Sequence, residues 1–558
     1  MDAGNGTNLP DQQSPVRHFF SERFAIDLRS LTAFRIGLGV MLLADLWYRV
    51  THLIAHYTDS GVLPRTVIKL SELAEKFHDP SFVWYWSLHK ISGEPWFELT
   101  LFITAAVFAV CLLIGYRTRT AALASWVLLY SLHQRNFAIN GASDGMLRAI
   151  LFWSLFLPLG SMLSVDRWFR RPAQMILKRV FSVGSSALLL QVCFVYFFTA
   201  LHKYSSVWWP GPAGARTTEF SAIYYALSLD SHVSVFGHWL LRFPTLLRLL
   251  TATTFLLELI GPLLVFSPII LRWLRIPLVF IFMGFHLGMF ATMELGTFPF
   301  VAIVAWLPFI PSDFWDWCGR CSNRMSFVAD SSVRRKVRRR LVSFRRLWVQ
   351  HRRRTLWSSS PAILRHSVGS ALSVIAAILL LYVFAWNVRE VATDWTRREI
   401  VNFEDWLPRM LPYRLNGIGR VAGLDQRWAM YAPGPPVDDG WYVMRGVLRD
   451  GTEVNLWCPD TPLSYDKPRN VSATYVDQRW RLFLWNFRND HRNQAYHSQY
   501  RKYFVEWLIR RWNQYHSNGR PERRVQHVEI IFRLERTPKP GDPYLEPKSV
   551  MLICGDVG

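Results

Sequence analysis

The sequence predicts a mainly α protein, a polytopic transmembrane helical bundle of about nine helices followed by a small α+β extracytoplasmic domain. Three observations predict this fold class. Apolar residues make up 51% of the 558-residue chain and charged residues only 19%, which is fewer than a soluble protein usually carries. The 26 Trp and 20 Tyr residues suit a protein with many membrane boundaries, where amphipathic rings collect. After Trp386 the composition changes to that of a soluble domain.

Five segments follow one another along the chain. Residues 1–30 form the predicted cytoplasmic N-terminus, of which 1–20 are polar and show no cleavable signal peptide. A membrane domain of about eight helices covers 31–312 and precedes a basic cytoplasmic loop, 313–366. The ninth transmembrane helix is 367–387, and the extracytoplasmic domain is 388–558. The apolar segments, most of them near the 20 or so residues that a span requires, are 31–50, 97–115, 121–139, 145–163, 183–202, 249–268, 275–293, 296–312 and 367–386.

The distribution of basic residues predicts the orientation of these helices. Lys and Arg concentrate in alternate connections, as the positive-inside rule expects for a cytoplasmic N-terminus and nine spans. The loop 313–366 alone carries fourteen Lys or Arg against three acidic residues. Beside a membrane, such a run indicates contact with anionic lipid. We therefore interpret the net charge of +23 as membrane binding and expect no nucleic-acid partner.

The soluble domain shows strand and helix patterns. Residues 441–457 predict a β-hairpin with its turn at Asp450-Gly451. Residues 477–515 predict one or two helices, because aromatic residues recur there at helical spacing. Alternating apolar residues at 528–534 predict a half-buried strand, which 550–553 can pair with.

Six cysteines show no disulfide framework. Cys458 and Cys554 both fall in the predicted extracytoplasmic domain, where an oxidising compartment would permit a bond between them. Cys318 and Cys321 form a lone CxxC at a membrane edge, which we interpret as incidental. The sequence therefore predicts no metal site.

Polar residues inside predicted spans are costly and are candidate functional residues by default. Each also has a structural interpretation: an intramembrane acid can pair with a neighbouring cation, a histidine can be satisfied in the interior, and a lysine can snorkel to the headgroups. Asp144 and Arg148, one helical turn apart, are able to pair with each other. The candidates are Lys203, His286, Glu258, Asp144, Arg148 and Trp208.

Lys203 is the candidate with the clearest chemistry. It ends the fifth predicted span and precedes Trp208-Trp209, so it is expected to lose hydration among aromatic rings. Loss of hydration disfavours the ammonium form of a lysine. A neutral amine is a base that can take a proton from a phenol-like or hydroquinone-like molecule.

Several segments of the chain form a pattern that extends from about Phe24 to the end. They are Phe34-Arg35-Ile36-Gly37, Tyr116-Arg117-Thr118-Arg119, Ser164-Val165-Asp166, Ala200-Leu201-His202-Lys203-Tyr204, Phe255-Leu256-Leu257-Glu258, Phe285-His286-Leu287, Leu295-Gly296-Thr297-Phe298-Pro299-Phe300 and Asp425-Gln426-Arg427-Trp428-Ala429-Met430-Tyr431-Ala432-Pro433. This pattern resembles the vitamin K-dependent gamma-carboxylase-like membrane proteins, including their bacterial HTTM-domain members. The resemblance implies a bacterial inner-membrane protein with a periplasmic C-terminal domain.

The resemblance also implies a reaction. In the carboxylase, a lysine deprotonates reduced vitamin K, oxygen converts the quinol toward its epoxide, and the strong base formed removes a proton from a glutamate of a partner protein, which then adds carbon dioxide. Lys203 matches that lysine. His286 would orient the substrate, and Glu258 would tune the pocket. The implied cofactor is reduced vitamin K or menaquinone, and the implied partner is a protein or peptide substrate.

One departure keeps two functions open. The carboxylases carry a Trp-Asn-Asn-His element before the fourth span, whereas this chain has Ala142, Ser143 and Asp144 near the position of that histidine. The first hypothesis is a carboxylase-like, quinol-using enzyme with Lys203 as base. The alternative is a non-catalytic membrane scaffold that binds lipid, quinone or a partner protein. A transporter is less favoured, since no inverted repeat is evident.

Overall fold

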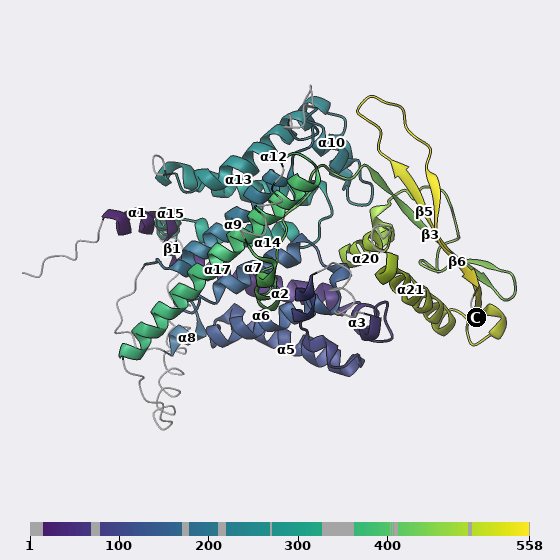
Figure 1. Cartoon of the computed structure of the whole chain (residues 1–558), viewed down its shortest axis with the longest axis horizontal. Helices are drawn as coiled ribbons and strands as arrows, with labels where there is room; N and C mark the ends of the chain where they lie inside the picture. The colour runs from purple at the N-terminus through teal and green to yellow at the C-terminus, as the bar shows by residue number, and fades with distance from the viewer. Residues whose placement is uncertain are drawn as a thin grey trace, which may run out of the picture.

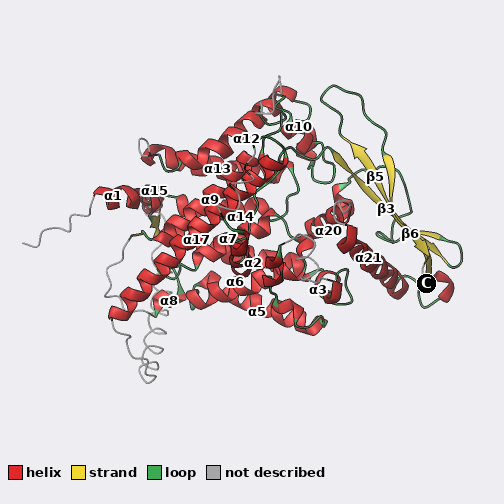
Figure 2. Ribbon diagram, in the orientation of Figure 1, coloured by secondary structure: helices red, strands yellow, loops and turns green. Residues whose placement is uncertain are grey.

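A computed structural model of the chain shows a bundle of long helices and a small antiparallel sheet near the C-terminus (Figures 1 and 2). This arrangement confirms the mainly helical fold class and the sheet after it. The structure describes residues 15–67, 79–169, 178–209, 219–267, 271–325, 362–401, 403, 406, 411–488 and 494–556. The predicted basic loop lies largely outside these residues, as do 1–14 of the predicted N-terminus.

Six helices in the described part of the chain are long and apolar enough to cross a membrane. Each has at least 18 residues, a length close to the thickness of the hydrocarbon core, and few charges. They are α2 (Leu28–Val50), α5 (Pro95–Ile114), α9 (Val183–His202), α12 (Pro244–Leu264), α13 (Leu271–Thr292) and α17 (Ala362–Arg397). The structure is thus that of a multi-pass membrane protein by length and composition.

Three other predicted spans form shorter or more polar helices. α6 (Thr118–Arg135) has 18 residues but polar ends, α7 (Ala142–Ser154) has 13 residues, and α14 (Phe298–Trp306) has 9. After a short 3-10 turn, α14 is followed by α15 (Ser312–Met325) across a bend of 93°. The expected total of about nine spans therefore stays a prediction.

The remaining helices are short connectors or belong to the C-terminal region. They are α1 (Pro15–Phe24), α3 (Leu53–Tyr57), α8 (Val165–Trp168), α10 (Ala222–Leu227), α11 (Val235–Leu240), α19 (Asn416–Ala422), α20 (Gln478–Arg488) and α21 (Gln494–Tyr515). Two short strands, β1 (Ile26–Asp27) and β2 (Arg179–Val180), pair just before α2 and α9. α17 is longer than the predicted 367–387, because its polar last turns continue alongside the end of α9.

The C-terminal sheet matches the sequence pattern. Its strand order is β4-β3-β5-β6, and all neighbours are antiparallel. The strands are β3 (Asp438–Leu448), β4 (Glu453–Asn455), β5 (Val525–Arg536) and β6 (Lys548–Asp556). The predicted hairpin, the alternating strand and its partner strand are therefore confirmed. Cys458 and Cys554 are both free thiols, so the structure does not contain the disulfide that the sequence allowed.

The sheet, α20 and α21 share one hydrophobic core with the end of the helical bundle. Phe483 of α20 and Phe504 of α21 are fully buried between the sheet residue Ile530 and the bundle residue Tyr57. Figure 1 shows α20 and α21 between the bundle and the sheet. The C-terminal region is therefore docked on the bundle through α20, which reaches the polar residues described next.

Candidate functional site

The helical bundle contains a partly open cavity of about 510 Å³ beside the end of α9, the middle of α12 and the C-terminal half of α13. Its wall is mostly apolar, and a drug-sized or cofactor-sized molecule fits such a volume. Residues of α20 and of the segment 430–431 also line the cavity. Four of the six sequence candidates line it, namely Lys203, Trp208, Glu258 and His286.

Lys203 and Glu258 form a buried pair at the cavity wall. Lys203 follows the last residue of α9, Glu258 lies in the middle of α12, and the lysine Nζ is 2.5 Å from the glutamate Oε2. Lys203 is 4% exposed and Glu258 6%. The Nζ atom also lies 4.0 Å from the ring centroid of Trp208, a cation–π distance. Two charges in a low-dielectric site are stable only together, so each residue fixes the other.

The end of α9 is held in place by α17. His202 Nδ1 lies 2.8 Å from Asp394 Oδ2, and the Trp395 indole donates to the carbonyl of Leu201 at 3.1 Å. Beyond the end of α9, the Trp208 indole donates to the carbonyl of Tyr431 at 2.9 Å. These contacts fix the backbone on both sides of Lys203, so its amine has one defined position at the cavity.

His286 reaches the cavity from α13 through a chain of hydrogen bonds. The Trp306 indole donates to the Tyr196 hydroxyl at 2.8 Å, and this hydroxyl lies 2.7 Å from His286 Nε2. We assign the Tyr196 hydroxyl proton to the contact with Nε2, so that Nδ1 is the donor of the neutral imidazole. Nδ1 is buried and has no partner among the described residues. His286 therefore offers one unused hydrogen bond to a molecule in the cavity.

Asp144 does not belong to the cavity, although its neighbours Ala142 and Ser143 line it. Its carboxylate turns instead to two arginines, Arg49 at 2.5 Å and Arg479 at 2.6 Å. Arg148 lies elsewhere again, donating at 3.0 Å to the backbone carbonyl of Asp425. The structure therefore brings Lys203, Glu258, His286 and Trp208 together and separates Asp144 and Arg148 from them.

Asp45, Arg49, Asp144 and Arg479 form a buried cluster that we name the junction network. Arg49 bonds to Asp45 and Asp144 inside the bundle, and Arg479 of α20 bonds to the same two aspartates. None of the four is more than 3% exposed. His133 lies 3.5 Å from Asp144, and the set Asp45, His133 and Asp144 has the composition of a metal site. Because two guanidinium groups already neutralise both carboxylates, this cluster is structural.

A second cavity of about 370 Å³ adjoins the first and is more polar. The two share Glu294, Gln478 and Arg481 in their walls. Arg481 lies at this boundary, where its guanidinium donates to the backbone carbonyl of Glu294 at 2.6 Å and to its carboxylate at 2.9 Å. The apolar cavity therefore has a polar neighbour on the side that faces α20.

Two further titratable groups line the apolar cavity outside the spans. Burial, together with the nearby Arg481, lowers the pKa of His232 to about 3, so this imidazole is neutral at ordinary pH. Burial also raises the pKa of Tyr431 above its usual value, so its hydroxyl keeps its proton. Among the described residues, the charged groups of the wall are thus two ion pairs, Lys203–Glu258 and the Arg481–Glu294 pair at the boundary of the two cavities.

Sequence analysis missed several residues of the site. Tyr196 precedes Lys203 by seven residues on α9, a spacing that places both on one helix face, and this spacing could have revealed it. Tyr431, Arg481 and Asp394 carry no comparable sequence signal. No family model, curated protein or solved structure matches the chain.

Proposed function

We propose that the protein is a membrane enzyme that binds a lipophilic quinol and uses Lys203 as the base that takes a hydroxyl proton from it. One observation carries this proposal, namely the buried Lys203–Glu258 pair in the wall of a mostly apolar cavity of about 510 Å³. A reduced vitamin K or a menaquinol has the apolar ring and the weakly acidic hydroxyl group that suit such a wall. The resemblance of the Lys203 segment to the carboxylases supports the same choice of molecule.

Proton transfer to Glu258 would make Lys203 a neutral amine, which is a base. The ammonium–carboxylate form and the neutral amine–carboxylic acid form differ only in the position of one proton along a 2.5 Å contact. An apolar wall disfavours separated charge, and in the neutral form the amine lone pair accepts the carboxylic acid proton. The amine becomes available as a base when it exchanges this hydrogen bond for one to the quinol hydroxyl. Lys203 can then take the hydroxyl proton, and the ammonium formed is stabilised by the Trp208 ring.

His286 has a positioning role in this proposal. Its free Nδ1–H can donate to an oxygen of the bound molecule, while the Tyr196–Trp306 chain holds the ring in one orientation. Hydrogen-bond donors that are already oriented cost little reorganisation when negative charge develops on an oxygen. We therefore expect His286 to hold the oxygen from which Lys203 takes the proton, or the oxygen across the ring from it.

Oxygenation of the quinol tests the proposal. Purified protein in liposomes would receive reduced menaquinone or reduced vitamin K and oxygen, and quinone epoxide would be measured by mass spectrometry. The balanced reaction converts one quinol and one dioxygen into one epoxide and one water. Epoxide formed in proportion to protein supports the proposal. Its absence from folded protein with both quinols would overturn it.

Carboxylation is the narrower part of the proposal. A glutamate-rich peptide and bicarbonate added to the same reaction would yield a peptide heavier by one carboxyl group. Carboxylation would require a place for the acidic side chain of the peptide, and the polar cavity at Arg481 is the part of the described structure that suits it. Epoxide without peptide carboxylation would restrict the function to quinol oxygenation.

Filling the cavity should block quinone binding. Gly288 lines the cavity on α13, and a Cβ at this position would meet no atom within 4 Å, so the backbone has room for the first atom of the leucine in Gly288→Leu. We expect this variant to lose at least about tenfold in quinone affinity, the effect of some 1.4 kcal/mol. Tryptophan fluorescence quenching by menaquinone in detergent would measure the affinity.

Gly319→Leu is the matched control for this change. Gly319 lies in α15, away from the cavity wall, and its Cβ also would meet no atom within 4 Å. Quinone affinity of this control should equal that of the wild type. Equal affinities in all three proteins would contradict the location of the site.

A non-catalytic scaffold remains the second candidate, and the position of Asp144 favours it. The carboxylases have a histidine in this neighbourhood, whereas Asp144 is fully engaged by Arg49 and Arg479 and does not face the cavity. Among the described residues, Ala142 and Ser143 line this part of the wall, and neither is a titratable group that could assist oxygen chemistry. Quinone binding without epoxide formation would identify this function.

We further propose that the N-terminus is cytoplasmic and that the C-terminal domain lies outside, in a bacterial inner membrane. The alternation of basic connections supports this orientation, and the fourteen basic residues of 313–366 support contact between that loop and anionic lipid. Labelling of single cysteines in cells would test it. Cys554, exposed in the sheet, should react with a membrane-impermeant maleimide added to intact spheroplasts that have been treated with a metal chelator.

A further inference from the structure

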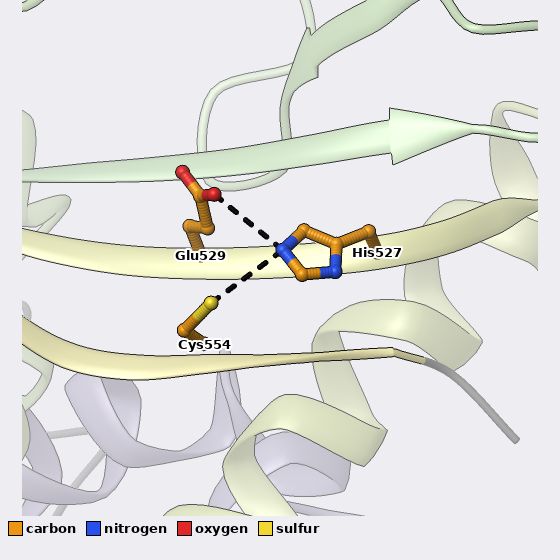
Figure 3. Close-up of side chains that lie close together, drawn as sticks. All are labelled: His527, Glu529 and Cys554. Carbon is orange, nitrogen blue, oxygen red and sulfur yellow. Dashed lines mark hydrogen bonds and ion pairs between the residues drawn. The ribbon is translucent and has the colours of Figure 1, made fainter.

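Three metal-ligating side chains meet on one face of the C-terminal sheet. His527 and Glu529 are two residues apart on β5, so both point to the same face, and Cys554 of β6 lies directly opposite Glu529 in the antiparallel register. Figure 3 shows the Glu529 carboxylate and the Cys554 thiol approaching the same imidazole nitrogen of His527. All three ligand atoms lie within 4.8 Å of one another.

The distances between these atoms suit a tetrahedral ion. His527 Nε2 is 3.4 Å from Glu529 Oε1 and 3.6 Å from Cys554 Sγ. With ordinary zinc–nitrogen, zinc–oxygen and zinc–sulfur bond lengths, the edges of a coordination tetrahedron are about 3.3 Å between nitrogen and oxygen and about 3.5 Å between nitrogen and sulfur. Both distances from His527 Nε2 therefore match the edges of a zinc site, and the sulfur and the carboxylate oxygen lie within 4.8 Å of each other.

Neighbouring residues orient the ligands as they do in metal sites. Asp556, opposite His527 on β6, lies with its Oδ1 2.6 Å from His527 Nδ1. We assign the Nδ1 proton to this contact, which leaves the Nε2 lone pair directed at the thiol and the carboxylate. Arg445 of β3 lies 2.9 Å from Glu529 Oε1 and also pairs with Glu453. It can hold the carboxylate while the other lone pairs of Glu529 bind an ion.

We infer that His527, Glu529 and Cys554 bind a zinc ion through Nε2, a carboxylate oxygen and the thiolate. A neutral imidazole, one carboxylate and one thiolate balance the two charges of the ion. The mixed nitrogen, oxygen and sulfur set suits zinc better than calcium or magnesium, which prefer oxygen alone. The fourth coordination position of the ion faces solvent, because Cys554 is exposed and the other two ligands are half-buried. This site is separate from the proposed quinol cavity and does not depend on it.

The position of the site gives the ion a structural effect. β6 is an edge strand, paired only with β5, and it carries the last described residues of the chain. An ion bound by Cys554, His527 and Glu529 would stabilise the pairing of β6 with β5, since an ion that binds only the folded state stabilises that state. Zinc should therefore raise the unfolding temperature of the C-terminal region.

Metal content of the full chain in detergent tests the inference. Protein made metal-free with a chelator would be supplied with zinc, desalted and measured by mass spectrometry of the metal. We expect one zinc per chain, and cobalt in its place should give a thiolate-to-cobalt charge-transfer band. Cys554→Ser should abolish the band and the bound zinc. Asp556→Asn, which alters only the partner of His527, should weaken zinc binding by roughly 10–100-fold.

Two control variants separate this site from the other cysteines. Cys458→Ser changes the half-buried thiol of the same domain, and Cys318→Ser with Cys321→Ser removes the CxxC of α15. Both should keep one zinc and the cobalt band. The inference is overturned if wild-type protein retains no zinc, or if Cys554→Ser retains it while remaining folded by circular dichroism.

Discussion

Lys203→Met is expected to lower the rate of quinol oxygenation by roughly 10²–10⁴-fold, the usual effect of removing a general base. Methionine has nearly the length of lysine and no basic nitrogen, so it keeps the contact with the Trp208 ring but cannot take the hydroxyl proton. Quinone affinity should change much less than the rate, because the cavity wall is otherwise intact. Single-turnover formation of epoxide and fluorescence titration with menaquinone would measure the two quantities.

The main difficulty of this variant is that it leaves Glu258 without its partner. Removal of one member of a buried pair destabilises a protein by more than removal of both. Lys203→Met combined with Glu258→Leu removes both charges, so it should fold at least as well as the single variant and still be inactive. Lys90→Met is the matched control, since Lys90 is half-buried but does not line the cavity. Wild-type turnover by the folded double variant would exclude Lys203 as the base.

Arg479→Met is expected to destabilise the protein by about 3–5 kcal/mol, the cost of leaving a buried charge uncompensated. Arg479 is 3% exposed and bonds both Asp45 and Asp144, so its removal leaves two buried carboxylates against the single guanidinium of Arg49. Because Arg479 joins α20 to the buried aspartates of the bundle, we expect the C-terminal region to separate first. Limited proteolysis and thermal unfolding in detergent would show this as early cleavage around α20.

A second substitution should restore much of the stability that Arg479→Met loses. Asp144→Asn keeps an oxygen for the backbone amide of Gly141 and removes one negative charge, so Arg479→Met with Asp144→Asn leaves one aspartate against one arginine. Arg65→Met is the control on an exposed pair: Arg65 bonds Asp59 with side chains 31% and 39% exposed. We expect the control to cost less than about 1 kcal/mol. Additive losses in the double variant would contradict the charge balance that we assign to the junction network.

The comparison of these two sites shows what a sequence can and cannot specify. Lys203, Glu258 and His286 could be selected from the sequence because an ionisable residue in an apolar segment is costly wherever the segment packs. The sequence could not show, however, that Lys203 and Glu258 form a pair. Lys203 and Glu258 are 55 residues apart in the sequence and come into contact because α9 packs on α12. The sequence of neither segment indicates which residue of the other it will contact.

Asp144 shows the same limit, because the partner that the sequence suggests is not the one that the structure contains. The sequence placed it near Arg148, one turn away on the same helix, and in the neighbourhood of the carboxylase histidine. In the structure its second guanidinium comes from Arg479, 335 residues later. A buried carboxylate must be paired, but the arginine that pairs with it is chosen by the docking of α20 and not by distance along the chain.

The zinc ligands gave no sequence signal for a related reason. His527 and Cys554 are 27 residues apart, and their spacing matches no metal motif. The antiparallel register of β5 and β6 places Cys554 opposite Glu529, and alternation along β5 places His527 beside them. A shift of the register by one residue would turn the thiol to the other face of the sheet.

The sequence by itself determined the apolar helices, the change to a soluble composition after Trp386 and the strands of the C-terminal sheet. These features follow from local periodicity and from the cost of placing polar groups in an apolar medium, both of which act along a short stretch of chain. Only the tertiary structure decided which charged residues are neighbours, where the cavity lies and how the C-terminal region docks. Electrostatic pairing acts over a few ångströms in space, and folding alone brings distant residues within that range.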